Sequence, residues 1–142
     1  MDRQAHFDQV LARARARPNL TVHDSDAPLD PQGQVVRASY VVLHDLGPDV
    51  IGDDRYQARQ AVDSARTMRV VGRCVGVDPA AARRVATVFG GPMDKHVMTV
   101  PGRTCRPIVV DDESEVEKDT TVSPPLWFVD VDFTYRTVPK GV

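Results

Sequence analysis

The stretch from residue 67 to residue 91 constrains the fold of this 142-residue chain more than any other. Residues 67–77 (TMRVVGRCVGV) predict a strand, because β-branched side chains alternate with small or polar ones. Three small residues leave one face of that strand almost bare: Gly72, Cys74 and Gly76. A helix can pack unusually close to such a face, so the sequence predicts a tight strand–helix unit here.

The helix of this unit is predicted over residues 79–90. Asp78 suits the N-cap and Pro79 suits the first helical position, while Gly90–Gly91 predict the end of the helix. Its spacing gives one apolar stripe, which would cover the bare face of the strand. That stripe consists of Ala81, Ala82, Val85, Val88 and Phe89.

An amphipathic helix is also predicted near the amino terminus, over residues 2–17. Its apolar stripe is formed by Phe7, Val10, Leu11 and Ala14, and Pro18 ends the segment. Arginines cluster near its carboxyl end, where they complement the helix dipole. We favour arginines that face water on a helix covering a sheet over a nucleic-acid-binding arm.

Strands account for most of the remaining chain, in keeping with 24 Val against six Leu. They are predicted at 21–24, 34–46, 97–100, 106–110 and 126–138, in addition to 67–77. The last one alternates apolar and polar residues, as expected for a strand with one buried and one wet face. The sequence therefore predicts one α+β domain over residues 1–142, a mainly antiparallel or mixed sheet covered by an N-terminal and a central helix.

Two polar segments interrupt this pattern. Residues 47–65 hold Gly, Pro and Asp and predict a long surface excursion. Residues 111–119 (DDESEVEKD) contain six acids and one Lys, a net charge of −5, and predict an acidic loop that continues through 125. Six acids in nine residues repel one another, so this segment is expected to be exposed and mobile.

Composition excludes several classes of protein. A net charge of −2 and 42% hydrophobic residues argue against a disordered chain and against a strongly basic nucleic-acid-binding module. No window approaches the roughly 20 apolar residues that cross a bilayer, and the first residues do not resemble a signal peptide. We expect a soluble protein that stays where it is made. Cys74 and Cys105 are too few for a disulfide scaffold.

No catalytic, cofactor or metal site is predicted. The four histidines (His6, His23, His44 and His96) are scattered and match no metal-binding or catalytic spacing. The run 72–76 lacks a phosphate-binding pattern, and Cys74 is interpreted as a packed hydrophobe. The carboxylate pairs Asp53–Asp54 and Asp130/Asp132 are of a kind that binds hard cations, but a solvated loop and a wet strand face are favoured.

The order of elements resembles the tail terminator (tail completion) proteins of long-tailed bacteriophages, the lambda-type minor tail proteins. The resemblance covers residues 2–139. It rests on residues 38–44 followed by Gly47-Pro48-Asp49, on 70–78 (VVGRCVGVD) leading into a helix over 79–91, and on the aspartate-bearing strand 127–135.

This resemblance implies a structural virion protein without catalytic residues. Six copies would form a ring that caps the tail tube, stops its polymerisation and docks onto the head–tail connector or head completion protein. DNA would pass through the ring without sequence-specific binding, and no membrane is involved. The implied location is the tail–neck boundary of the virion, after assembly in the host cytoplasm.

Two segments are candidates for contacts within and beyond such a ring, which needs two unlike patches on each subunit. The excursion contributes Asp49, Asp53, Asp54, Arg55, Tyr56 and Arg59. The acidic loop contributes Asp111, Asp112, Glu113, Glu115 and Glu117, which are proposed to face the central channel or its rim. An outward-facing solvated hairpin, or docking onto a basic patch of the next ring, remains open for the same loop.

Two other functions also remain open. One is a different neck or head-completion ring protein of the same virion, and the other is a small hydrolase or nucleotide-binding enzyme. The native mass separates a ring from a monomeric enzyme, and the neighbouring genes separate the two kinds of ring protein.

Overall fold

The computed structural model describes residues 2–50 and 65–140, which form two helices and a seven-stranded sheet. The first half contains α1 (Arg3–Arg15), β1 (Val22–Asp24), β2 (Tyr40–Val50) and β3 (Arg66–Gly76). The second half contains α2 (Pro79–Met93), β4 (Arg103–Cys105), β5 (Val109–Glu113), β6 (Glu117–Asp119) and β7 (Leu126–Pro139). The predicted α+β class is confirmed.

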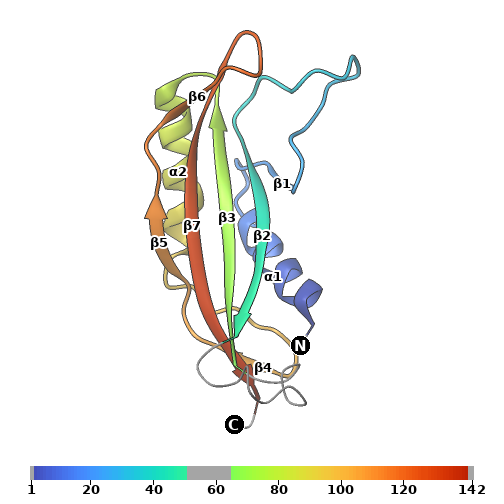
Figure 1. The fold of residues 1–142 in the computed structure, drawn as a ribbon, viewed down its shortest axis with the longest axis vertical. Helices are drawn as coiled ribbons and strands as arrows, with labels where there is room; N and C mark the ends of the chain where they lie inside the picture. Colours follow the sequence, from blue (N-terminus) through green and yellow to red (C-terminus); the bar gives the residue numbers. More distant parts are fainter. Residues whose placement is uncertain (1, 51–64, 141–142) are drawn as a thin grey trace.

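The sheet is built around three long strands, in the order β2–β3–β7 (Figure 1). Both pairings between them are antiparallel, whereas the short β1 runs parallel to β2 at the far edge. On its other side β7 pairs in turn with β4, β5 and β6, each of which covers a different part of its length. Both helices lie on the same face of the sheet, which leaves the opposite face open.

The main core lies between the helices and the sheet. The predicted alternation of the last strand is confirmed, since Val129, Val131, Phe133 and Tyr135 are all buried. Phe89 of α2 packs against Phe133, with ring centroids 6.0 Å apart. The side chains of β2 divide as the period of two requires, because Val41 and Leu43 join this core whereas Tyr40 and Val42 point to the other face.

The predicted close packing of α2 on β3 is also confirmed. A Cβ built on Gly72 would lie 2.4 Å from Cε2 of Phe89, and one on Gly76 would lie 2.4 Å from the backbone nitrogen of Ala82. Neither position therefore accommodates a side chain unless the helix moves away. Cys74 lies between the two glycines with no exposed surface, as expected for a packed hydrophobe.

The end of α2 differs from the prediction. The helix continues through Gly90 and Gly91 to Met93, because neither glycine adopts the positive φ that ends a helix and Met93 is buried in the core. Arg13 of α1 donates a hydrogen bond to the carbonyl of Pro92 at this end (3.0 Å). Val88, predicted to lie in the buried stripe, is 42% exposed, and Ala86 and Met93 complete the stripe instead.

Several strand boundaries were predicted wrongly. β2 begins six residues later than expected and continues beyond Leu46, past a bulge at Asp45/Gly47 where Gly47 has a φ of +90°. Residues 47–50 of the predicted excursion therefore belong to the sheet. Residues 97–100 form no strand, although Met98 and Val100 are buried, which explains their apolar alternation. β4 was missed, and β5 lies at Val109–Glu113 rather than at 106–110.

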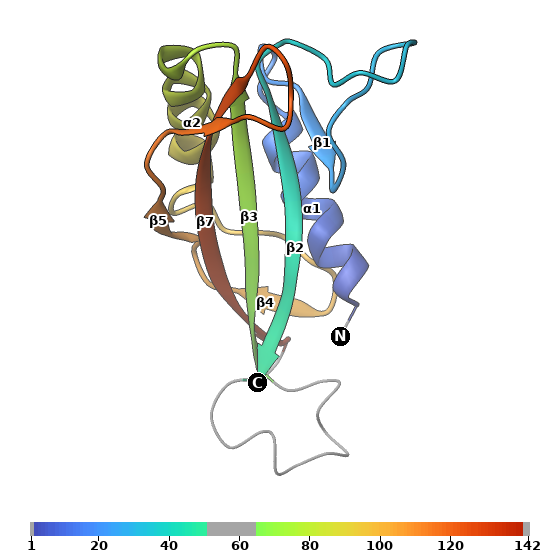
Figure 2. The ribbon, with the colours of Figure 1, turned by 45° about the horizontal axis from the view of Figure 1, so that its top comes forward.

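Residues 25–39, here called the arm, project from the end of the sheet where β2 begins (Figure 2). The arm has internal structure, because Asp30 accepts hydrogen bonds from the backbone nitrogens of Gln32 and Gln34 (both 2.9 Å). A β-bridge joins Leu29 to Val35. The arm is attached to the body by a hydrogen bond from Arg37 to the carbonyl of Pro124.

Both edges of the sheet are poorly suited to adding a further strand. Beyond β1, the outer edge of β2 carries the bulge, Pro48 and an ion pair between Arg3 of α1 and Asp45 (2.7 Å). The opposite edge consists of short strands that carry several carboxylates. Bulges, proline, short strands and edge charges are the features that prevent sheets from pairing edge to edge.

Candidate functional site

The acidic segment flanks the sheet and is not a free loop. β5 contains Asp111, Asp112 and Glu113, β6 contains Glu117, and Glu115 lies between the two strands. All five side chains are exposed, as predicted, but pairing with β7 contradicts the prediction of a loop. Both strands are short and rich in acids, which have low strand propensity, so neither was recognised from the sequence. β6 pairs with the start of β7 through a short connection, whereas β5 pairs further along β7.

Like charges meet on the open face of the sheet beside this flank. Asp112 of β5 lies opposite Asp132 of β7 in the strand register. The pKa of Asp132 is raised by burial and by the neighbouring carboxylates Asp130 and Asp112, and Arg69 offsets only part of this effect. Carboxylates therefore line two neighbouring strands at this side of the sheet.

One of these carboxylates is neutralised locally. Arg73 of β3 forms a two-pronged interaction with Asp130 of β7, at 2.9 Å from Nε to Oδ1 and 3.1 Å from Nη2 to Oδ2. The guanidinium also lies 4.1 Å from the ring centroid of Phe128. The hydrogen bonds that Arg73 donates to Asp130 raise the pKa of its guanidinium, which therefore stays charged.

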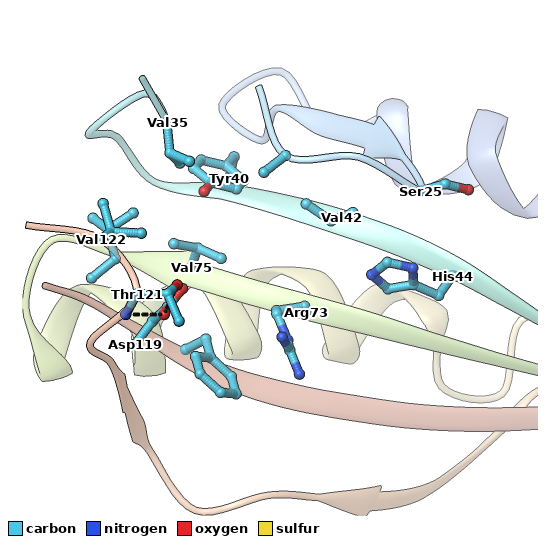
Figure 3. A pocket seen from close by; sticks show the side chains of 13 residues that line it. Ser25, Val35, Tyr40, Val42, His44, Arg73, Val75, Asp119, Thr121 and Val122 are labelled. Carbon is cyan, nitrogen blue, oxygen red and sulfur yellow. Dashed lines mark hydrogen bonds between the residues drawn. The ribbon is translucent and has the colours of Figure 1, made fainter. Parts of the chain in front are cut away.

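A cavity of about 240 Å³ lies on the open face, next to this ion pair (Figure 3). Its apolar lining is a second, smaller cluster of buried residues, formed by Tyr40, Val42, Val75 and Leu126. The arm and the loop after β6 close its sides with Val35 and Val122. The open face of β7 was predicted to be wet. This is wrong at the first residue of the strand, because Leu126 is buried there.

The cavity also contains Ser25 and His44, which raises the question of nucleophilic catalysis. Such catalysis requires a hydrogen bond between the nucleophile and its base. The hydroxyl of Ser25 instead donates to Asp24 at 2.6 Å, and it points away from His44 in Figure 3. Within residues 2–50 and 65–140, no group of three or more potential ligands is arranged to hold a metal ion.

The two predicted contact segments are not brought together by the described residues. Asp49 lies in β2, opposite Thr67 of β3. The other predicted residues of the excursion lie outside the described part: Asp53, Asp54, Arg55, Tyr56 and Arg59. The arm and the second apolar cluster were not predicted from the sequence. The signal for the cluster was present, because apolar residues occupy both faces of β2 at Tyr40–Leu43.

No family model matches this sequence, and no curated protein matches it. Among solved structures, the fold is similar to that of a chain from the virion of a native gene transfer agent (GTA) particle. The TM-score is 0.63 at 14% identity, over 92% of both chains. A second solved chain has a TM-score of 0.57 at 18% identity, over 95% of this chain and 92% of the other. At these identities the likeness shows the fold.

In the described part of the chain, no helix combines the length and the apolar character that crossing a bilayer requires.

Proposed function

We propose that this chain is a structural virion protein that acts as a tail terminator, the ring subunit that caps a tail tube. The observation that carries the proposal is the likeness to a chain of the GTA virion, which extends over nearly the whole length of both chains. The order of elements along the sequence, which resembles tail terminators, supports the same function. In this proposal six copies surround a channel through which DNA passes without sequence-specific contacts.

The shape and charge of the subunit support a ring with unlike contact surfaces on its two sides. One side presents the acidic strands β5 and β6, whereas the other presents α1, β1 and the arm (Figure 1). A ring built from head-to-tail contacts requires this kind of asymmetry, because each interface joins two different patches. Because neither edge of the sheet is suited to adding a strand, contacts between copies are expected to use side chains rather than strand pairing.

The length of the tails tests this function. When particles are assembled without this chain, we expect tail tubes of uncontrolled length that are not joined to heads, since nothing stops tube polymerisation. Electron microscopy of the particles measures this directly, and adding back the intact chain should restore uniform tails. Tails of normal length that lack heads would instead identify a neck or head-completion protein.

The acidic segment 111–119, here called the acidic flank, is proposed to face the channel or its rim. Six copies of a segment with a net charge of −5 bring a formal charge of about −30, which would keep DNA phosphates from adhering. We expect that replacing Asp111, Asp112, Glu113, Glu115 and Glu117 with serine leaves tails intact and slows DNA ejection.

The readout for this variant is the rate of DNA release from purified particles, with Asp8→Asn on the exposed face of α1 as the control. A defect in head joining at unchanged ejection rate would assign the flank to docking. If both head joining and DNA ejection are unchanged, the acidic flank is a solvated surface on the outside of the ring.

A further inference from the structure

The tip of the arm is held in one conformation by its own hydrogen bonds. It is fixed by the two hydrogen bonds to Asp30, by one from Gly33 to the carbonyl of Asp30 (2.9 Å) and by the bridge from Leu29 to Val35. Leu29 is nevertheless 62% exposed, more than any other large apolar side chain in the described ranges. An apolar side chain on an ordered projection loses little conformational freedom when it is buried at an interface.

The outer face of α2 is complementary to the tip of the arm in charge and in exposed apolar surface. Arg83 and Arg84 are exposed there, and neither forms an ion pair in the part of the chain that the structure describes. Val88, one helical turn after Arg84, is 42% exposed on the same face. Arg83 lies beside Glu113 and Glu115 in one hollow, so the part of this face that is basic and apolar consists of Arg84 and Val88. The tip of the arm carries Asp26 and Asp30 on either side of Leu29.

The arm and the outer face of α2 are also placed so that they can meet between neighbouring copies in a ring. β3 leads into α2 at the same end of the sheet from which the arm projects, and the two lie on opposite sides of the molecule in both views (Figures 1 and 2). A contact between patches at the same height relates neighbouring copies mainly by rotation. Repetition of such a contact closes a ring, whereas a large rise would produce an open helix.

We propose that the arm of one copy docks onto the outer face of α2 of a second copy. Leu29 packs against Val88 and the stem of Arg84, and the carboxylate of Asp26 faces the guanidinium group of Arg84. The occupant of this helix face is thus another copy of the chain. The inference rests on the proposed ring and names the interface that would hold it together.

Disulfide trapping in the full chain tests the contact. We expect Leu29→Cys in one copy and Val88→Cys in another to form a linked dimer under mild oxidation. A chain with both changes should give a ladder of linked species that ends at the size of the ring. The native thiols do not interfere, because Cys74 and Cys105 are buried.

The matched control pairs Leu29→Cys with Leu46→Cys, since Leu46 is 53% exposed on β2, away from α2. Linked dimer from the control pair at the level of the test pair would overturn the proposal, as would the absence of dimer from the test pair.

A charge exchange provides a second test. We expect Asp26→Arg or Arg84→Glu alone to weaken self-association by about tenfold, and the two together to restore most of it. Sedimentation or native mass spectrometry gives the association constants. Asp30 is left unchanged in this test because it holds the tip of the arm.

The two proposals fail in different ways. Rings that assemble normally in Leu29→Asp and in both single charge variants would refute the docking of the arm and leave the ring intact. Particles with normal tails in the absence of the chain would refute the function itself.

Discussion

Replacing Phe89 with aspartate is expected to leave the chain unfolded at room temperature. The ring of Phe89 is 1% exposed, lies against Gly72 of β3 and packs on Phe133 of β7. Loss of a buried aromatic ring costs about 3–5 kcal/mol, and a buried carboxylate without a partner adds several more. The sum approaches the entire stability of a typical domain, which is about 5–15 kcal/mol.

Val88→Asp is the matched control, because Val88 precedes Phe89 in the same helix but faces outward. We expect that variant to unfold at nearly the same urea concentration as the unchanged chain, since surface substitutions shift stability by only about 0.5 kcal/mol. Circular dichroism during urea titration measures both variants. A folded Phe89→Asp protein with a wild-type midpoint would show that this side of α2 does not face the core.

Acid is expected to destabilise the fold through His6. This side chain has no exposed surface, and its Nδ1 lies 2.9 Å from the hydroxyl of Tyr135. Its Nε2 is buried without a hydrogen-bond partner among the described residues. Burial, followed by the charge of Arg103, lowers the pKa of His6 from 6.5 to about 4, and Asp2 opposes the shift.

The direction of the effect follows from proton binding. Between pH 6.5 and about 4 the unfolded chain binds a proton at His6 whereas the folded chain does not. Stability is therefore complete above pH 6.5, falls across this window and levels off below the folded pKa. The full loss is about 3 kcal/mol. The raised pKa of Asp132 acts in the opposite direction, so it cannot cause the loss.

Urea titrations from about pH 7 down to about pH 4 measure this slope. His6→Gln should flatten it, because glutamine can still hydrogen-bond to Tyr135 and does not titrate. His96→Gln should retain most of the slope, since His96 is less buried although its pKa is lowered by burial and by Arg13. Equal slopes in the unchanged chain and in His6→Gln would contradict the assignment.

Local signals in the sequence predicted the centre of the fold well. The bare face of β3, the N-cap at Asp78 and the alternation of β7 all act over a few residues, so they can be recognised without knowledge of the partner strand. The apolar stripe of α1 was placed in the same way, apart from its partly exposed Leu11.

The errors concern features that depend on distant partners. The acidic residues of β5 have low strand propensity, and only pairing with β7 holds them extended. Gly90 and Gly91 remain helical because Met93 is buried beyond them. Residues 34–39 of the arm resembled the start of a long strand, since Val35 and Val36 precede Tyr40. Among the described residues, however, no strand lies beside them to continue the ladder.

The divided outer side of β7 bears on how such a chain can diverge. Three separate strands of three to five residues pair there, each with its own part of β7. An insertion or a change of charge between two of them leaves the register of the third unaltered, while β2, β3 and β7 preserve the centre. A lineage can therefore adapt this flank to a new partner one strand at a time, and the fold persists in solved chains at 14% and 18% identity.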